Sequence, residues 1–419
     1  MLGNLLTKNK MELIYILLMT IAFTTRYGDL QIGYEIQFTI GIILIVICCI
    51  FLLKNKDKDI YDLKCFFKMY FVPHLLIHLY TIILMVVKKV SWSYFTTNAS
   101  VYIPTLIALC SIYMFGEKAY KYNFVALICS WCLSVFISLI TKGIYIFPHA
   151  ILQAYINPFD TIGGLTSNYL ELHDLVLALG YIVVYYIYKS EKTKKSDLPI
   201  IFMVLLIMIL GMKRISILGI FLSVLFIKII KYVPENKKYN ICKFFGVMIF
   251  IISYLFIYMV SNGELFYNIM SKFNINVMGR NYYYDAIIKY SDFSIKFLGT
   301  GRNSVTKILN NQLSYLKVGG VHSDIIKMYV ENGFIVFGLW LWYYLIKITK
   351  CYTKRYGISA GILYFSLTIY TFTLYFTDNT ENYFICQIFN IIIPITYSLK
   401  IVKENKNKEK LEKKNERKI

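Results

Sequence analysis

The feature of this sequence that most limits its fold is a series of apolar runs, each about 17 to 25 residues long, along the whole chain. A run of this length is what a helix needs to cross the hydrocarbon core of a bilayer. The composition agrees, because 58% of the 419 residues are hydrophobic and only 16% are charged, which is unlike a soluble globular domain. The sequence therefore predicts an all-α integral membrane protein.

The apolar runs give about twelve expected transmembrane helices. They lie at residues 11–25, 36–53, 65–87, 100–115, 122–140, 171–188, 198–212, 215–230, 241–260, 322–348, 357–376 and 383–399. We expect a polytopic transmembrane domain over residues 1–402, with a large external loop at residues 261–321 between the ninth and tenth helices. The basic tail at residues 403–419 is rich in Lys, Glu and Asn and is expected to be disordered.

The positions of lysine and arginine predict which loops face the cytoplasm. If the N-terminus is cytoplasmic, every second loop carries a cluster of basic residues, as the positive-inside rule requires. The net charge of +21 follows from these loops and the tail, so no nucleic-acid partner is expected. We expect a multi-pass protein of the inner (cytoplasmic) membrane, surrounded by membrane lipids, with both termini in the cytoplasm.

The cysteines and two histidines give only weak indications of a site. The nine cysteines lie mostly in or beside apolar runs, so neither a disulfide framework nor a metal cluster is expected outside the membrane. Cys129 and Cys132 have redox-like spacing but are better explained as small core residues. His74 and His78 share one run without a nearby carboxylate, so a metal site or proton relay there is the weaker alternative. No metal and no cofactor are expected.

Basic residues beside glycines and at one helix end indicate an anionic ligand outside the membrane. Arg280 and Arg302 each follow a glycine in the external loop. Guanidinium groups bind diphosphate oxygens in pairs, and glycine lets the backbone come close. Lys213 and Arg214 lie at an external helix end, against the positive-inside rule. A solvated arginine in an ordinary turn remains the simpler explanation for either loop position.

His322 follows two glycines and opens a long predicted helix. From residue 322 to residue 348 such a helix is about 40 Å long, so His322 would stand at its outer end. Helical phasing turns His322 toward the bundle and sends Asp324 and Glu331 to the opposite side, so we expect no chemistry from these carboxylates. The helix dipole at this end favours a neutral ring that accepts a proton. A histidine bonded to the backbone is the simple structural alternative.

The last external loop carries Asp378 and Glu381 directly before the final apolar run. Carboxylates in such a loop bind sugar hydroxyl groups, and they also cap the first turn of a helix. The sequence leaves both interpretations open.

Together these motifs resemble the O-antigen polymerase and O-antigen ligase superfamily. The resemblance rests on the Lys213-Arg214 junction, on Arg280 followed by Phe297-Leu298-Gly299-Thr300-Gly301, on His322 with a glycine at Gly333, and on Gly163-Gly164-Leu165-Thr166-Ser167-Asn168-Tyr169. It implies a GT-C-like helical fold, substrates linked to undecaprenyl diphosphate at the outer face of the membrane, and a reaction that needs no metal.

The resemblance also implies roles for individual residues. His322 would act as the general base on an acceptor hydroxyl group, with Arg280 as the second catalytic residue. The remaining positions would hold the diphosphate, namely Arg214, Lys213 and Arg302, or the acceptor and sugar, namely Asn168, Asp378 and Glu381. The family often has serine before the arginine of the junction, so the choice between Lys213 and Arg214 stays open.

The function predicted in this way is that of a polymerase, a metal-independent glycosyltransferase that joins lipid-linked oligosaccharide repeat units into a surface or capsular polysaccharide. A chain-length regulator and a flippase are the expected protein partners. A ligase that transfers a finished glycan is the first alternative. A flippase for lipid-linked oligosaccharides, or another transporter, is the second, and His74 and His78 are its main support.

Overall fold

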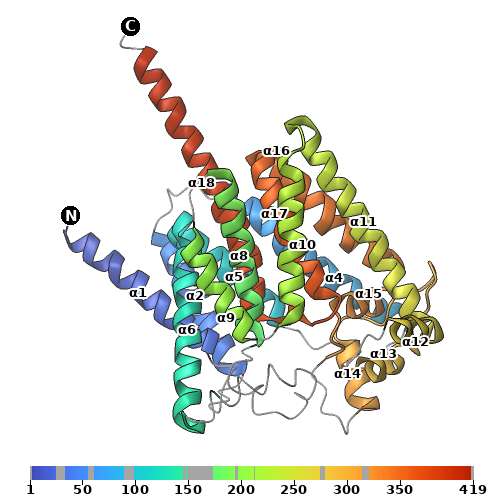
Figure 1. The fold of residues 1–419 in the computed structure, drawn as a ribbon. Coiled ribbons are helices and arrows are strands. Elements are labelled where there is room, and N and C mark those ends of the chain that lie inside the picture. Colours follow the sequence, from blue (N-terminus) through green and yellow to red (C-terminus); the bar gives the residue numbers. More distant parts are fainter. Residues whose placement is uncertain are drawn as a thin grey trace. The chain divides into compact units, whose positions relative to one another are not determined.

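The computed structural model describes most of the chain and shows helices as its regular elements (Figure 1). The described residues are 2–24, 34–54, 61–88, 99–144, 148, 173–193, 197–211, 213–273, 279–313 and 320–416. Within these ranges all regular secondary structure is helical, which confirms the all-α prediction.

Seven of the described helical segments are long and apolar enough to cross a membrane. They are Glu35–Leu53, Leu63–Val87, Val101–Thr141, Glu235–Ser261, Asp324–Tyr356, Ile358–Tyr375 and Phe384–Glu409. An integral membrane protein is thus the class that the structure supports. The count of about twelve transmembrane helices and the GT-C-like arrangement stay predictions.

The helices form two compact units, and the first unit comprises Met1–Phe67, Ala99–Phe221 and Tyr383–Ile419. Its helices are α1 (Leu2–Thr24), α2 (Tyr34–Lys54), α5 (Ala99–Phe115), α6 (Ala119–Lys142), α8 (His173–Thr193), α9 (Leu198–Leu210) and α18 (Phe384–Glu416). Helix α1 packs against α6, and α18 packs against α5 and α8. Buried hydroxyl groups join α1 to α6, since Thr24 Oγ1 donates to Ser130 Oγ at 2.9 Å, the kind of polar contact that holds helices together in lipid.

Helix α18 differs from its prediction at the C-terminal end of the chain. The expected disordered tail begins at residue 403, whereas α18 continues to Glu416. Lysine and glutamate alternate along this part of the sequence, and Lys400 Nζ lies 3.7 Å from Glu404 Oε1 one turn later. Pairs of this spacing stabilise an exposed helix, which explains why a segment with so few apolar residues is helical.

The second unit comprises Lys68–Asn98 and Leu222–Asn382 and contains most of the predicted site residues. Its helices are α4 (Val72–Lys88), α11 (Glu235–Ser261), α12 (Gly263–Lys272), α13 (Arg280–Ile288), α14 (Ser304–Gln312), α15 (Asp324–Trp342), η4 (Tyr343–Lys347), α16 (Ile348–Tyr356), α17 (Ile358–Tyr375) and η5 (Thr380–Asn382). Helices α3 (Tyr61–Tyr70) and α10 (Arg214–Lys231) span the sequence boundaries between the units.

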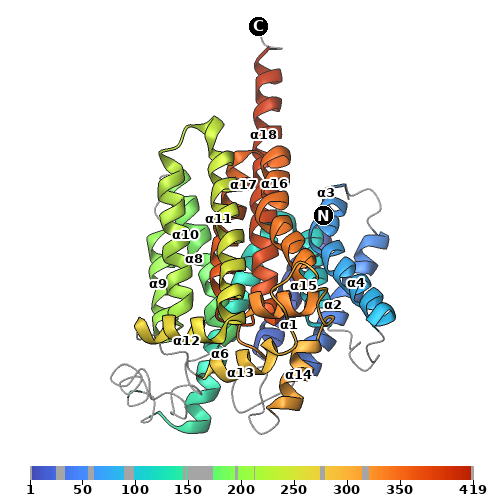
Figure 2. The same ribbon diagram turned by 90° about the vertical axis from the view of Figure 1, so that its right-hand side faces the viewer.

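The described part of the predicted external loop is folded into three short helices. Figure 2 shows α12, α13 and α14 grouped at one end of α11, and α14 packs against α15. The buried sides of these helices join the apolar core of the second unit through Phe266, Tyr284 and Leu309. The described part of the loop therefore contributes to the core of the second unit.

Helix α15 is interrupted at Gly333, where the sequence predicts one continuous helix from residue 322. Gly333 has φ 74° and ψ 177°, a conformation that residues with a side chain rarely adopt. The interruption releases two carbonyl groups, which accept hydrogen bonds from a neighbouring segment: Thr300 N donates to Val330 O at 2.9 Å and Gly301 N to Glu331 O at 2.8 Å. The segment 299–301 is therefore inserted into the kink.

Two glycines make this insertion possible because the backbones touch there. A Cβ on Gly299 would lie 2.5 Å from the carbonyl oxygen of Glu331, and one on Gly333 would lie 2.4 Å from that of Phe297. Both distances are well inside van der Waals contact, so neither position has room for a side chain. The Gly299-Thr300-Gly301 motif thus has a structural reason that the sequence did not disclose.

Candidate functional site

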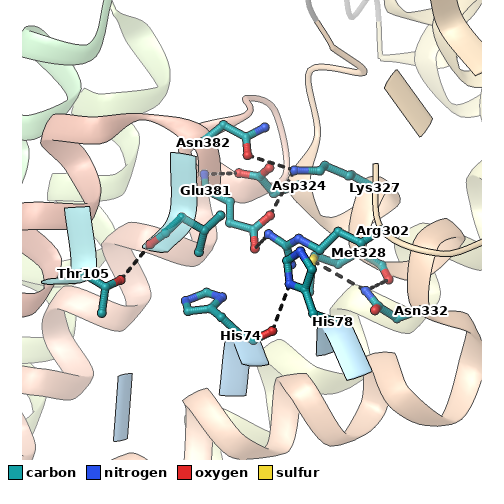
Figure 3. A network of polar contacts seen from close by, with 11 residues as sticks. His74, His78, Thr105, Arg302, Asp324, Lys327, Met328, Asn332, Glu381 and Asn382 are labelled. Atoms are coloured by element: carbon teal, nitrogen blue, oxygen red, sulfur yellow. Dashed lines mark hydrogen bonds and ion pairs between the residues drawn. The ribbon is translucent and has the colours of Figure 1, made fainter. Parts of the chain in front are cut away.

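A buried network of charged side chains lies directly beside the kink (Figure 3). Glu381 is bonded to two cations, with Arg302 Nη2 at 2.9 Å from Oε1 and Lys327 Nζ at 3.1 Å from Oε2. The side chains of Arg302, Lys327 and Glu381 are only 1%, 3% and 3% exposed. Charges removed from water to this degree are stable only as a hydrogen-bonded set.

Three separate elements bring these charges together. Arg302 follows the inserted segment directly, and its backbone N donates to Thr81 Oγ1 on α4 at 3.1 Å. Lys327 lies in the first turn of α15, and Glu381 lies in η5. Burial acts to raise the pKa of Glu381, but the charges of Arg302 and Lys327 outweigh it and hold that pKa below the usual 4.5.

Asp324 and Glu331 are fully buried, which overturns the prediction that they face away from the bundle. Asp324 Oδ2 accepts a hydrogen bond from the backbone N of Glu381 at 2.7 Å. Glu331 lies one turn beyond Lys327 on the same side of α15, and the two charges interact. Helical phasing identified this polar side correctly, but η5 and the segment that ends at Arg302 cover it, so it does not face water.

His322 lies outside α15 and has an unusual backbone conformation. The helix begins at Asp324 with Ser323 as its N-cap, so His322 precedes it by two residues, and the expectation that His322 opens the helix is wrong. Its φ of 52° is in the left-handed region, where few residues other than glycine occur. The half-buried ring packs against that of Tyr283, with 5.8 Å between the centroids.

Arg280 is the first residue of α13 and is half-buried. Tyr283 follows three residues later and therefore lies on the same side of the helix. Since Tyr283 contacts His322, the ring of His322 lies against the helix whose first residue is Arg280. Arg280 also lowers the pKa of Tyr284, one helical turn later. Its charge opposes the effect of burial, which raises that pKa to about 12.

The other predicted ligands have different surroundings. Arg302 and Glu381 are bonded to each other. Asp378 is buried too, and its Oδ1 accepts a hydrogen bond from the backbone N of Asn379 at 2.8 Å. Lys213 and the exposed Arg214 belong to the first unit, and Asn168 lies outside the described residues.

His74 and His78 are buried on α4 and are connected to the charged network. His78 Nδ1 lies at hydrogen-bond distance, 3.2 Å, from the carbonyl oxygen of His74. Both rings interact electrostatically with Arg302 and Glu381, so a carboxylate does lie near them, contrary to the sequence-based expectation. Among the described residues no group of three or more potential ligands is arranged for a metal ion.

Lys327 is the member of this network that the sequence analysis missed as a site residue. A signal was present, since Asp324, Lys327 and Glu331 recur at helical spacing at the start of an otherwise apolar run. Ionisable residues in a membrane span usually have a function or a charged partner, because an unpaired charge in lipid is energetically costly. Its partner Glu381 lies 54 residues further on, and nothing in the sequence announces the pairing.

A family model described as O-antigen ligase matches residues 199–341. The predicted resemblance to the O-antigen polymerase and ligase superfamily is confirmed over these residues, whereas the 163–169 motif lies outside the match. The part that matches the O-antigen ligase family contains Lys213, Arg214, Arg280, Arg302 and His322, and it ends before Asp378 and Glu381. No curated protein and no solved structure matches the chain significantly. The O-antigen ligase match, together with the apolar helices, supports an integral membrane protein of polysaccharide biosynthesis and a glycan transferase of the polymerase or ligase type.

Proposed function

We propose that the protein is a polymerase that joins undecaprenyl-diphosphate-linked oligosaccharide repeat units at the outer face of the cytoplasmic membrane. One observation carries the proposal: the His322 ring packs on Tyr283, on the side of α13 that begins with Arg280. His322, a proton acceptor, thus packs on the helix whose first residue carries a guanidinium group, and both residues lie in the region that matches the O-antigen ligase family. Both termini would be cytoplasmic, and a chain-length regulator and a flippase are the proposed partners.

In the proposed reaction, a hydroxyl oxygen of the acceptor repeat unit attacks the anomeric carbon of the donor. The new glycosidic bond forms as the bond from that carbon to the diphosphate oxygen breaks, and the lipid diphosphate departs with the bonding electrons. His322 takes the hydroxyl proton as general base. Arg280 stabilises the charge that develops on the departing diphosphate, a role for which a bidentate donor at a helix N-terminus is well suited. No metal or cofactor takes part.

The other residues predicted to bind diphosphate or sugar differ in how well the structure supports that role. Lys213 and Arg214 are proposed diphosphate ligands on the family resemblance alone, and so is Asn168 as a ligand of the acceptor. The buried ion pair favours a structural role for Arg302 and Glu381 over contact with the substrate. Asp378, whose carboxylate is bonded to its own loop, fits the same interpretation.

Substitution of His322 tests the proposal. His322→Ala should abolish polymer and leave single carrier-linked repeat units in the membrane, with the protein present at its normal level. Arg280→Ala should do the same, whereas Lys289→Ala removes an exposed cation from the other end of α13 and should leave polymer unchanged. Polymer of normal amount and length in the His322→Ala strain would contradict the proposal.

A ligase of the same superfamily is the close alternative. The two activities differ in what accumulates when the gene is deleted. Single carrier-linked repeat units indicate the polymerase, and long carrier-linked chains indicate the ligase. Separation of the lipid-linked glycans by size is therefore the decisive measurement.

A flippase for lipid-linked oligosaccharides is the second candidate, and the buried charges favour it. Lys327 and Glu331 lie in a candidate membrane span, and His74 and His78 lie in another. Buried ionisable groups within spans are typical of transport pathways. If the purified protein moves fluorescent carrier lipid across liposome membranes without forming polymer, the flippase is the correct assignment.

A further inference from the structure

The backbone around His322 is held by one segment, residues 375–382, which begins at the last residue of α17, includes η5 and is called the 375–382 loop below. On the C-terminal side of His322 there are three bonds to this loop. Ser323 Oγ donates to the carbonyl oxygen of Tyr375 at 3.2 Å, and the backbone N of Asp324 donates to that of Asp378 at 3.1 Å. The third runs in the opposite sense, since the backbone N of Glu381 donates to Asp324 Oδ2 at 2.7 Å.

On the N-terminal side of His322 the same loop is in close contact with Gly320. A Cβ built on Gly320 would lie 2.5 Å from Asn379 Nδ2 and 3.1 Å from Asn379 Cγ. The absence of a side chain at residue 320 is therefore what lets Asn379 approach. The 375–382 loop thus contacts the chain two residues before His322 and again one and two residues after it.

The 375–382 loop is itself fixed in place. Glu381 joins it to Arg302 and Lys327 through the buried ion pairs, and Lys327 Nζ donates in addition to Asn382 Oδ1 at 3.1 Å. Within the loop, the backbone N of Asn382 donates to the carbonyl oxygen of Asn379 at 3.1 Å. A loop that is anchored to α15 and to the segment before α14 can hold a neighbouring backbone in one conformation.

His322 needs such support because its conformation is unfavourable in isolation. Its φ of 52° lies in the left-handed region, and a residue with a side chain remains there only when its surroundings define the backbone on both sides. The conformation also fixes the direction of the Cα–Cβ bond and so restricts where the ring can point. Strain of this kind is typical of positions where the orientation of one side chain matters.

We propose that the 375–382 loop positions His322, with Glu381 as the positioning residue, and that this loop orients the imidazole against Tyr283 for proton transfer. The inference rests on the proposed function for the role of His322 in the reaction. Glu381 then affects the orientation of His322 indirectly and does not contact the substrate. The residue acts through Asp324 and the backbone, because both its carboxylate oxygens are bonded to protein cations.

Gly320→Ala tests this assignment, because it introduces the clash with Asn379 while leaving every charge in place. The full-length protein is assayed in proteoliposomes with carrier-linked repeat units extracted from a deletion strain. We expect kcat to fall about 10-fold and KM to change less than about twofold, since a displaced catalytic group affects the chemical step most. The double variant Gly320→Ala/Asn379→Ala removes the obstructing side chain and should restore kcat to within about threefold of wild type.

Gly263→Ala is the matched control. Nothing lies within 4 Å of a Cβ at Gly263, and its φ is not in the left-handed region, so kcat should be unchanged. A second measurement does not depend on the reaction. Diethyl pyrocarbonate acylates accessible imidazole nitrogens, and mass spectrometry of the peptide that contains residue 322 gives the rate. The rate should rise in Gly320→Ala and return toward wild type in the double variant.

The outcomes separate this inference from the proposed function. If Gly320→Ala matches wild type in kcat and in the acylation rate, the positioning role is wrong. It is also wrong if activity falls together with the melting temperature and the double variant restores neither. If His322→Ala still makes polymer, the proposed function fails, whereas the acylation rates still report whether the loop orients the ring.

Discussion

Two regions of the second unit each have an arginine that follows a glycine, and they use it in opposite ways. Arg302 is 1% exposed and bonded to Glu381 inside the charged network. Arg280 is half-buried at the start of α13, and a guanidinium group there can still meet a ligand. The first region joins distant parts of the chain through buried ion pairs, and the second keeps a partly exposed cation at a helix N-terminus. The surroundings, and not the residue type, thus favour a structural role for Arg302 and leave Arg280 as the proposed ligand of the diphosphate.

The largest effect is expected from breaking the first region. Glu381→Gln removes the carboxylate that is bonded to both Arg302 and Lys327, and removing one partner of a buried ion pair costs about 3–5 kcal/mol. The variant should show a much lower melting temperature in detergent and a reduced amount in the membrane. Glu235→Gln is the control, because Glu235 is 71% exposed and its bond to Lys238 is expected to contribute about 0–1 kcal/mol. Equal stability of the two variants would show that the network does not hold the unit together.

The second region should respond in activity and not in stability. Arg280→Ala removes a donor to the departing diphosphate, and the loss of one such donor lowers kcat by about 100- to 1000-fold. The melting temperature should stay within a few degrees of wild type, because the side chain is half-buried and no ion pair of it is described. Arg302→Ala should show the reverse pattern, with lost stability as its main defect. If both variants lost stability equally, the contrast between the two regions would be wrong.

Gly333→Ala tests the insertion that brings Arg302 into the network. A Cβ there would lie 2.3 Å from the backbone C of Leu298 and would also meet an unfavourable φ of 74°. We expect a loss of about 1–3 kcal/mol from backbone strain, and more if the segment 299–301 is displaced. Gly279→Ala is the matched control, since it has φ 76° but no atom within 4 Å of the added Cβ, so only the cost of a left-handed residue, about 1–2 kcal/mol, applies. Chemical denaturation of both variants gives the difference in their free energies of unfolding. Equal values would rule out a tight insertion of the segment 299–301.

The class of protein was predictable from the sequence because a bilayer imposes a simple rule on length and hydropathy. His322 and Arg280 were predictable as candidates, since polar residues with suitable chemistry stand out against apolar runs. The kink at Gly333 was not, because it depends on carbonyl groups of α15 that are bonded by residues 300 and 301. Helical periodicity shows which residues share one side of a helix. It does not show which distant segment of the chain packs against that side.

The roles of Asp324, Glu331 and Glu381 show this limit. The sequence turned Asp324 and Glu331 away from the bundle with no chemical role, and it left Glu381 either as a sugar ligand or as a helix cap. The structure buries them, because Arg302 and Lys327 offer the compensating charges. Lys213 and Arg214 are assigned to the site by the family resemblance alone. Their spacing in the sequence does not show which distant residues they contact.

The smallest expected effect is the response of the Arg302–Glu381 network to pH. A change of pH removes the charge of Glu381 without changing the volume of any side chain. The pKa of Glu381 is lowered in the folded protein, so its contribution to stability is fully present above the usual value of 4.5 and is lost as the pH falls through the lower folded value. Between pH 7 and pH 5 this carboxylate should therefore contribute no pH dependence. Below about pH 4 the melting temperature of wild type should fall more steeply than that of Glu381→Gln, which has no carboxylate to protonate. Parallel curves for the two proteins would mean that Glu381 is not the charged centre of the network, and Arg302 would then resemble Arg280 more than the buried ion pair indicates.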